Sequence, residues 1–399
     1  MNNAEVNGQP AQAPVAAPPA SPRSCRGFRG EYARLQWRVG EPGDPAQLLQ
    51  DFLVEQGLAV DSVQQLGAAP ADHGSGRLCG AAVFVSAAAG AAMLGAPAGP
   101  PSPAPAVPDV VAVVYHHRAG PAAPTPVGAA MQLGEWQESW SPERHADAVL
   151  QVQAAISRGE LHQLNLVGHG CAPYNGDPLP ALARLGALPG ARYGGVLTGV
   201  GWAVGCASPE TLIQVTAGRM RTRPIKGTRP ATAAGRSDLL ASVKERAEHA
   251  IAVDLARSDL GRVARTGTVR VDELFALRRW CRLWQAESVI SAQVEAGVGL
   301  ADLLRAVSPG GSVAGAPKRA ALALIAVLEP VGRGASMGAL GWVGPEGVDL
   351  GLTIRTAAAD GRRLHVWAGG GITWDSDPQA EVAEAAAKAA PLRAALTGG

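Results

Sequence analysis

The sequence predicts an α+β fold, in which helices and strands are interspersed without the regular strand–helix alternation of a parallel sheet. Two observations support this class. Apolar runs of strand length occur in both halves of the chain, and helical patterns lie between them at irregular intervals, without an internal repeat. With 399 residues, 47% of them hydrophobic, the chain can form one large or two smaller globular cores.

Short apolar runs bounded by turn residues predict the strands. The runs at 81–86 and 109–115 consist almost entirely of apolar residues, as buried strands do, and a Pro-rich loop separates them. In chain order, strands are expected at 81–86, 109–115, 163–167, 195–201, 211–215, 338–343, 348–356 and 363–368.

Helical patterns begin where a capping residue precedes an amphipathic stretch. Ser141 followed by Pro142 marks one such start, and the helix after it would carry Val149, Val152 and Ile156 on one face. Further helices are expected at 47–55, 238–257, 301–306, 317–328 and 378–396.

Charge, cysteine usage and hydropathy argue against several classes of protein. The 35 basic and 34 acidic residues leave a net charge of +1, without the basic excess of a nucleic-acid-binding protein. The five cysteines form no CxxC pair, which indicates reduced thiols in a cytoplasmic protein. Residues 1–25 are Pro/Ala-rich, predict a disordered tail and lack the apolar segment of a signal peptide. Residues 78–108 are uncharged, but prolines interrupt them, so no membrane span is predicted.

Lysine is rare in this chain, which has 31 arginines and only four lysines. Arginine is never a nucleophile and its head group is wider and planar, so lysine is expected where arginine cannot substitute. The lysines are Lys226, Lys244, Lys318 and Lys388. All four lie in the second half of the chain, where we therefore expect the chemistry.

Nine short motifs lie between residues 140 and 394. They occupy 159–166, 208–210, 222–229, 244–249, 259–262, 309–318, 354–356, 368–371 and 375–378. Each is weak alone, but together and in this order they closely resemble the chorismate-utilising enzymes. Within that family the segment Pro-Ile-Lys-Gly-Thr at 224–228 is similar to aminodeoxychorismate synthase component I, whereas anthranilate synthases have alanine in place of the lysine.

The resemblance implies a large sandwich of antiparallel β-sheets flanked by helices, with the active site between the sheets. It divides the chain into the tail at 1–25, a divergent N-terminal region at 26–135 and a chorismate-binding catalytic domain at 136–396. It also implies amination of chorismate at C4 to 4-amino-4-deoxychorismate, for 4-aminobenzoate in folate or secondary metabolism. Ammonia would come from a separate glutamine amidotransferase subunit in a heterodimer, since no cysteine lies in a Gly-x-Cys-x-Gly turn.

Lys226 and Glu210 are the catalytic candidates. In the family, the lysine that matches Lys226 adds to C2 of chorismate as the C4 hydroxyl leaves, and ammonia then enters at C4. Such a nucleophile must be uncharged, which burial or neighbouring cations favour, and Arg221, Arg223 and Arg229 are close in sequence. Glu210 matches the family's Ser-Pro-Glu and would protonate the leaving hydroxyl. A surface lysine in a basic turn and a surface glutamate are the alternative interpretations.

Two pairs of glutamates are candidates for binding a metal ion. Residues three apart share a helix face, so Glu245 with Glu248, and Glu381 with Glu384, could each present two carboxylates together. Chorismate carries two carboxylates, so an acidic surface would bind it only through a cation, and Mg²⁺ prefers oxygen ligands. The resemblance places Mg²⁺ here, with Glu248 and Glu384 as ligands and the other two in support. Ordinary salt bridges within the helices are the alternative.

The remaining candidates would hold the substrate. Backbone N–H groups of glycine-rich segments can approach a carboxylate closely, and an arginine can bind one through two N–H groups, although turn glycines are also common in this chain. The substrate-binding candidates are Gln163, Thr228, Gly310, Gly311, Ser312, Arg355, Gly370, Gly371 and Lys388. At the position of Gln163, isochorismate-forming relatives carry a lysine that activates water, so hydration of chorismate is disfavoured. Lys318 is expected to be structural.

Three positions depart from the family pattern. Gln285 replaces a histidine, Ser336 a tyrosine and Ala314 a threonine. Losing one such polar contact would weaken binding by about 1–2 kcal/mol without abolishing activity. Two other functions stay open: amination at C2, as in anthranilate synthase, and a non-catalytic paralogue that binds chorismate or regulates. Lys226 argues against the first, and the three replacements motivate the second.

Overall fold

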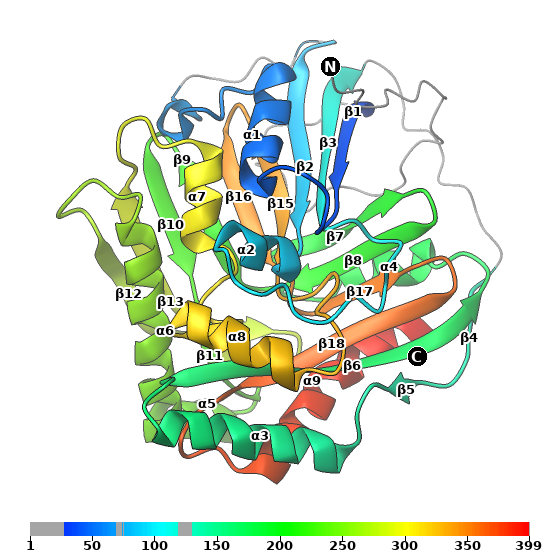
Figure 1. Ribbon diagram of the computed structural model, residues 1–399, viewed down its shortest axis with the longest axis vertical. Helices are drawn as coiled ribbons and strands as arrows, with labels where there is room; N and C mark the ends of the chain where they lie inside the picture. Colours follow the sequence, from blue (N-terminus) through cyan, green and yellow to red (C-terminus); the bar gives the residue numbers. More distant parts are fainter. Residues whose placement is uncertain (1–27, 69–73, 75, 119–129, 399) are drawn as a thin grey trace.

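The computed structural model describes residues 28–68, 74, 76–118 and 130–398, so the tail predicted at 1–25 lies outside the described residues. Within these ranges the chain forms two antiparallel sheets, one of ten strands and one of eight. In Figure 1 the strands of the smaller sheet cross those of the larger, and helices cover both. The predicted α+β class, with antiparallel sheets flanked by helices, is confirmed.

The ten-stranded sheet runs from the N-terminal strand to the strands around the site. Its order is β1 (Phe28–Trp37), β3 (Val110–Arg118), β2 (Leu78–Val85), β15 (Ala339–Gly344), β16 (Gly347–Leu352), β9 (Thr211–Thr216), β10 (Arg219–Arg223), β13 (Leu283–Gln293) and β11 (Ile225–Pro230), with β12 (Arg270–Trp280) paired to β13.

The eight-stranded sheet is built mainly from the middle and the C-terminal part of the chain. Its order is β14 (Gly315–Ala316), β6 (Gln163–Asn175), β18 (Arg363–Ile372), β17 (Thr356–Ala359), β8 (Trp202–Ser208) and β7 (Tyr193–Gly199), with β4 (Gln132–Leu133) and β5 (Gln137–Glu138) paired to β6.

Nine α-helices and one short 3₁₀ helix, η1 (Val63–Gln65), occur in the described part of the chain. The α-helices are α1 (Pro45–Glu55), α2 (Ala87–Met93), α3 (Pro142–Ser157), α4 (Leu179–Gly186), α5 (Ala233–Ala241), α6 (Val243–Gly261), α7 (Leu300–Val307), α8 (Lys318–Leu328) and α9 (Pro378–Thr397). None of these helices is long and apolar enough to cross a membrane.

The largest hydrophobic cluster joins α1 and α7 to the ten-stranded sheet and to residues of the smaller sheet such as Val204 and Trp367. Helices α3, α4 and α9 pack in two further clusters against the smaller sheet. Ser141 caps α3 as predicted, and Val149 and Val152 on its apolar face are fully buried. Burial of the largest cluster holds the two sheets together, since apolar area removed from water is the main stabilising contribution.

The N-terminal strands belong to the same sheet as strands from the catalytic part. β2 pairs with β15, from Ala81 opposite Val343 to Val85 opposite Ala339. The described part of residues 26–135 therefore shares its core with the rest of the chain. The division at 135 follows sequence resemblance and stays a prediction, and in the described residues one hydrophobic cluster contains residues from both sides of it.

The structure confirms the predicted strands and helices, with two differences. The helix expected at 238–257 is two helices, because the Ser242 side chain accepts a hydrogen bond from the Glu245 N–H and starts α6 anew. The strand expected at 348–356 is split between the sheets, and Arg355, with a φ of 55°, turns the chain from β16 into β17. As a result Glu245 lies in the first turn of α6 and Arg355 lies directly before β17, and both residues line the pocket described below.

Candidate active site

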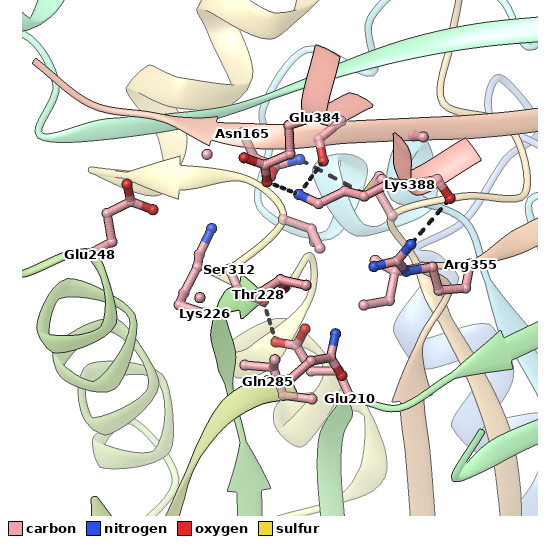
Figure 2. A pocket seen from close by; sticks show the side chains of 18 of the residues that line it. Asn165, Glu210, Lys226, Thr228, Glu248, Gln285, Ser312, Arg355, Glu384 and Lys388 are labelled. Carbon is pink, nitrogen blue, oxygen red and sulfur yellow. Dashed lines mark hydrogen bonds and ion pairs between the residues drawn. The ribbon is translucent and has the colours of Figure 1, made fainter. Parts of the chain in front are cut away.

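One pocket brings together most of the predicted residues. It contains about 930 Å³ of atom-free space, its open mouth included. Figure 2 shows side chains from several elements directed toward a common centre. The predicted residues that line it are Glu210, Lys226, Thr228, Glu245, Glu248, Ser312, Arg355, Gly371, Glu381, Glu384 and Lys388.

Lys226 and Thr228 reach the pocket from an irregular strand. The pairing of β11 with β13 shifts register between them, at Gly227. Gly227 has a φ of 86°, and a Cβ there would lie 2.9 Å from a methyl carbon of Leu239, so only glycine fits. The Lys226 ammonium lies against the opposite sheet, where a Cβ on Gly371 would be 2.7 Å from Nζ. The bulge in β11 and the glycine in β18 together make room for this lysine.

The charges around Lys226 differ from the sequence-based expectation. Arg223 pairs with Glu287, and Arg229 pairs with Asp238 and Glu245, so neither guanidinium is a free cation beside the lysine. Carboxylates interact with the Lys226 ammonium instead, from Glu210, Glu248 and Glu384. The proposed nucleophile therefore lies in an acidic pocket and not in a basic one.

Glu210 has the properties of a general acid. It follows β8 and is 4% exposed, and the Ser312 hydroxyl donates a hydrogen bond of 2.7 Å to its carboxylate. Burial raises the pKa of Glu210 to about 7, although the Ser312 hydrogen bond and the Lys226 charge act in the opposite direction. A carboxyl group with this pKa can carry a proton at neutral pH, as the departure of a hydroxyl group requires.

The four metal candidates line the pocket in two pairs, from α6 and α9. Every one of them lies beside a cationic side chain. The pairs are Arg229 with Glu245 (2.6 Å), Lys244 with Glu248 (3.8 Å) and with Glu381 (3.6 Å), and Lys388 with Glu384 (2.5 Å). Among the described residues, no three acidic, histidine or cysteine side chains lie close enough together to coordinate one metal ion by themselves.

Burial disfavours the charged form of Glu248, Glu381 and Glu384, so each carboxylate needs a neighbouring positive charge. Burial raises the pKa of Glu248 to about 7 and also raises that of Glu381. Burial acts the same way on Glu384, but the ammonium groups of Lys388, Lys226 and Lys244 together outweigh it and lower the pKa. The four side chains offer only oxygen donors, the type of ligand that Mg²⁺ prefers, and Mg²⁺ keeps further positions for water or substrate.

Arg355 and Lys388 form the cationic end of the pocket. The Arg355 guanidinium stacks on the Trp280 ring, 4.6 Å from its centroid, and donates a 3.1 Å hydrogen bond to the Lys388 carbonyl. Burial lowers the pKa of Arg355 to about 10, so it remains charged at neutral pH. Lys388 Nζ donates to the Gly369 carbonyl at 2.9 Å. These two cations can bind a carboxylate of a substrate.

Four predicted residues do not line this pocket. Gly310 and Gly311 line a smaller neighbouring pocket, which shares Glu210 and Ser312 with the first. A Cβ on Gly370 would lie 2.8 Å from a carboxylate oxygen of Glu381, so this glycine makes room for the glutamate. The fourth is Gln163, whose side-chain oxygen is buried without a hydrogen-bond partner in the described residues.

Sequence reasoning missed Asn165 and Lys244 as lining residues. Asn165 lies two residues after Gln163 on β6, and strand alternation could have indicated it. The scarcity of lysine could have indicated Lys244. Of the three departures from the family pattern, Gln285 lines the pocket, whereas Ser336 is buried elsewhere and donates to the Thr353 carbonyl at 3.1 Å. Ala314 is buried in the hydrophobic cluster formed with α3 and α8.

The predicted structural role of Lys318 is confirmed. It begins α8, and its buried ammonium binds both carboxylate oxygens of Asp259, at 3.0 and 2.9 Å. Three of the four lysines therefore lie at one pocket, and the fourth joins α6 to α8.

Comparison with known proteins identifies the family. The family model for chorismate binding enzymes matches residues 92–394. The chain belongs to this family. A structure of anthranilate synthase component I from Streptococcus pneumoniae shares the fold, with a TM-score of 0.73 over 98% of this chain and 94% of that chain, at 23% identity.

Curated relatives of this chorismate binding enzyme carry two names. The chain is 39% identical over 267 residues to aminodeoxychorismate synthase component 1 of Klebsiella aerogenes, covering 65% of this chain and 59% of the relative. It is 37% identical over 270 residues to anthranilate synthase component 1 of Streptomyces coelicolor, which covers 66% of this chain and 52% of that relative. These matches span less than two thirds of the length of the relatives.

Proposed function

We propose that this enzyme aminates chorismate at C4 with ammonia, giving 4-amino-4-deoxychorismate and water. The observation that carries the proposal is the position of Lys226, a lysine amine in the pocket with the buried acid Glu210. Relatives named aminodeoxychorismate synthase component 1 support the same reaction. The name anthranilate synthase among the other relatives leaves amination at C2 as the competing outcome.

In the proposed reaction Lys226 and Glu210 act on opposite ends of the diene. The Lys226 amine forms a bond to C2, the ring double bonds shift, and the bond from C4 to its hydroxyl breaks. Glu210 gives its proton to this hydroxyl, which leaves as water. Ammonia then forms a bond to C4 as the bond between C2 and Lys226 breaks, so the enzyme regains its free amine. The amine on C2 stays protonated and leaves as neutral Lys226, and the one proton that the new C4 ammonium loses returns Glu210 to its acid form.

The substrate carboxylates would be bound at two places. Arg355 and Lys388 offer N–H donors at one end of the pocket. On the wall formed by α6 and α9, Glu248 and Glu384, supported by Glu245 and Glu381, would hold Mg²⁺, with Glu384 beside Lys388. When bound, Mg²⁺ would supply the positive charge that lets a carboxylate approach this acidic wall.

The ammonia would come from a glutamine amidotransferase subunit. The relatives are called component 1, which implies a second component, and we infer the same arrangement here, in a cytoplasmic heterodimer. The product would serve 4-aminobenzoate synthesis for folate or for a secondary metabolite.

Product analysis tests the proposal. Purified protein is incubated with chorismate, Mg²⁺ and ammonium salt at mildly alkaline pH, and products are identified by chromatography and mass. The expected product is 4-amino-4-deoxychorismate, whereas anthranilate would move the reaction to C2. Unchanged chorismate, even after addition of glutamine and the amidotransferase, would favour a paralogue that binds without turnover.

Intact-mass analysis tests the role of Lys226. Rapidly quenched wild type should carry a covalent chorismate-derived adduct, and Lys226→Ala should carry none. Arg257→Ala, an exposed residue of α6 paired with Asp254, is the matched control and should keep the adduct. An adduct of the same yield in Lys226→Ala would rule out this lysine as the nucleophile.

A further inference from the structure

Lys244 connects the carboxylates of two helices that are distant in sequence. Its ammonium lies 3.8 Å from a carboxylate oxygen of Glu248 on α6 and 3.6 Å from one of Glu381 on α9. It also interacts electrostatically with Glu245 and Glu384. One ammonium thus lies among all four glutamates of the proposed metal site.

The surroundings of Lys244 explain why this ion pair differs from an ordinary helix salt bridge. Lys244 is in the first turn of α6, at the positive end of the helix dipole, where a cation is disfavoured. The attraction of the carboxylates must therefore hold the ammonium there. The side chain of Lys244 is 45% exposed, whereas those of Glu248 and Glu381 are 12% and 5% exposed. The lysine can turn out into solvent, but the carboxylates cannot follow it.

The residue type at this position is also informative. The chain uses arginine 31 times and lysine four times. An arginine would hold carboxylates with several fixed N–H donors, as Arg229 holds Glu245 at 2.6 Å. A lysine carries a compact charge on a flexible stem of four carbons, and it makes fewer directed bonds. Lysine is therefore the cationic residue that a competing cation displaces more easily.

We propose that Lys244 is a resident cation that neutralises these glutamates until a divalent metal ion displaces it. Lys244 then sets how tightly the pocket binds Mg²⁺, because the metal must replace its ion pairs with Glu248 and Glu381. This inference rests on the proposed Mg²⁺ site. After displacement the ammonium turns toward solvent, where water solvates it, and the carboxylate oxygens bind the metal.

Metal titration without substrate tests this role. The dissociation constant for Mg²⁺ is measured by calorimetry on the substrate-free protein, and Mn²⁺ binding is followed by electron paramagnetic resonance. Lys244→Met keeps an unbranched side chain one atom shorter and removes its charge, and we expect it to bind Mg²⁺ about tenfold more tightly than wild type. Lys244→Arg should bind Mg²⁺ more weakly than wild type, because its guanidinium is harder to displace.

Arg257→Met is the matched control, because it removes one positive charge from the same helix. Arg257 is exposed, pairs with Asp254 at 2.9 Å, and lies about 20 Å along α6 from Lys244. Its affinity for Mg²⁺ should equal that of wild type. Circular dichroism establishes that each variant is folded, and Lys244→Gln provides a second neutral variant. Mg²⁺ should also raise the melting temperature of Lys244→Met more than that of wild type.

The outcomes separate this inference from the metal site itself. If wild type binds Mg²⁺ and Lys244→Met binds it no more tightly, the role of Lys244 is wrong and the site stands. If Arg257→Met gains as much affinity for Mg²⁺ as Lys244→Met, the effect is one of net charge, and the role of Lys244 is overturned as well. Absence of Mg²⁺ binding in wild type and in both neutral variants would overturn the site and the inference together.

Discussion

Glu210→Gln is expected to make the folded protein more stable at alkaline pH while it removes activity. Glu210 is 4% exposed, and burial raises its pKa from 4.5, the value of an exposed glutamate, to about 7. Above that pH the folded protein must bury a charge that the unfolded chain exposes to water. Glutamine has nearly the same shape, carries no charge, and can still accept the Ser312 hydrogen bond.

The magnitude follows from the two pKa values. Between them the folded state binds more protons than the unfolded state, so stability falls as the pH rises through this window. A rise from 4.5 to about 7 corresponds to about 3 kcal/mol of lost stability, fully present above pH 7. Below the lower pKa both states are protonated and nothing is lost. The gain from Glu210→Gln should be near zero at about pH 4 and about 3 kcal/mol at about pH 8.

Urea unfolding of wild type and Glu210→Gln at the two pH values measures this gain. Amination should fall by a factor of about 10²–10⁴, because the acid is lost. Glu329→Gln is the control: Glu329 is also fully buried, but Arg333 binds it at 2.6 and 2.9 Å. Removing that charge leaves a buried guanidinium unpaired, which should cost about 3–5 kcal/mol.

Two outcomes would refute the reasoning. Equal stability of wild type and Glu210→Gln at alkaline pH would show that the folded protein does not pay for burying this charge. A stabilisation of the same size at acid pH would show that it arises from packing and not from ionisation.

Other predictions concern the glycines of β18 and the ion pair beside them. Gly371→Ala places a methyl group 2.7 Å from Lys226 Nζ, a flexible end, so urea unfolding should be unchanged while adduct formation by intact mass falls roughly tenfold. Gly369→Ala places a methyl group 1.9 Å from the Leu166 carbonyl, so the unfolding free energy should fall by about 1–3 kcal/mol. Arg333→Met leaves the buried Glu329 unpaired and should cost about 3–5 kcal/mol in the same assay, and a loss below about 1 kcal/mol would contradict this.

Local sequence patterns were sufficient to predict the helices and strands that bury one face against the core. The cap at Ser141 and the apolar face with Val149 and Val152 define α3 without any tertiary information. The split of 348–356 could not be predicted, because apolar residues continue through Ile354 while the chain changes sheet at Arg355. Only the pairing of β17 with β8 decides where the second strand begins.

The arginine-rich strands were missed for a related reason. β10 contains Arg219, Arg221 and Arg223, and its buried face consists of Met220 and Thr222 alone. So short an apolar pattern is weak in sequence. Its partners β9 and β13, which are hydrogen-bonded on either side, make it a strand.

By itself the sequence determined the α+β class, the family and most of the charged residues that line the pocket. Lys226, Glu210 and the two glutamate pairs could be found from motif order and from the scarcity of lysine. Only the tertiary structure decided their charge environment. Ser312 reaches Glu210 from 102 residues away, and Lys244 meets Glu381 from another helix. Burial and long-range charges set the protonation of a carboxylate, and neither is a property of its neighbours in sequence.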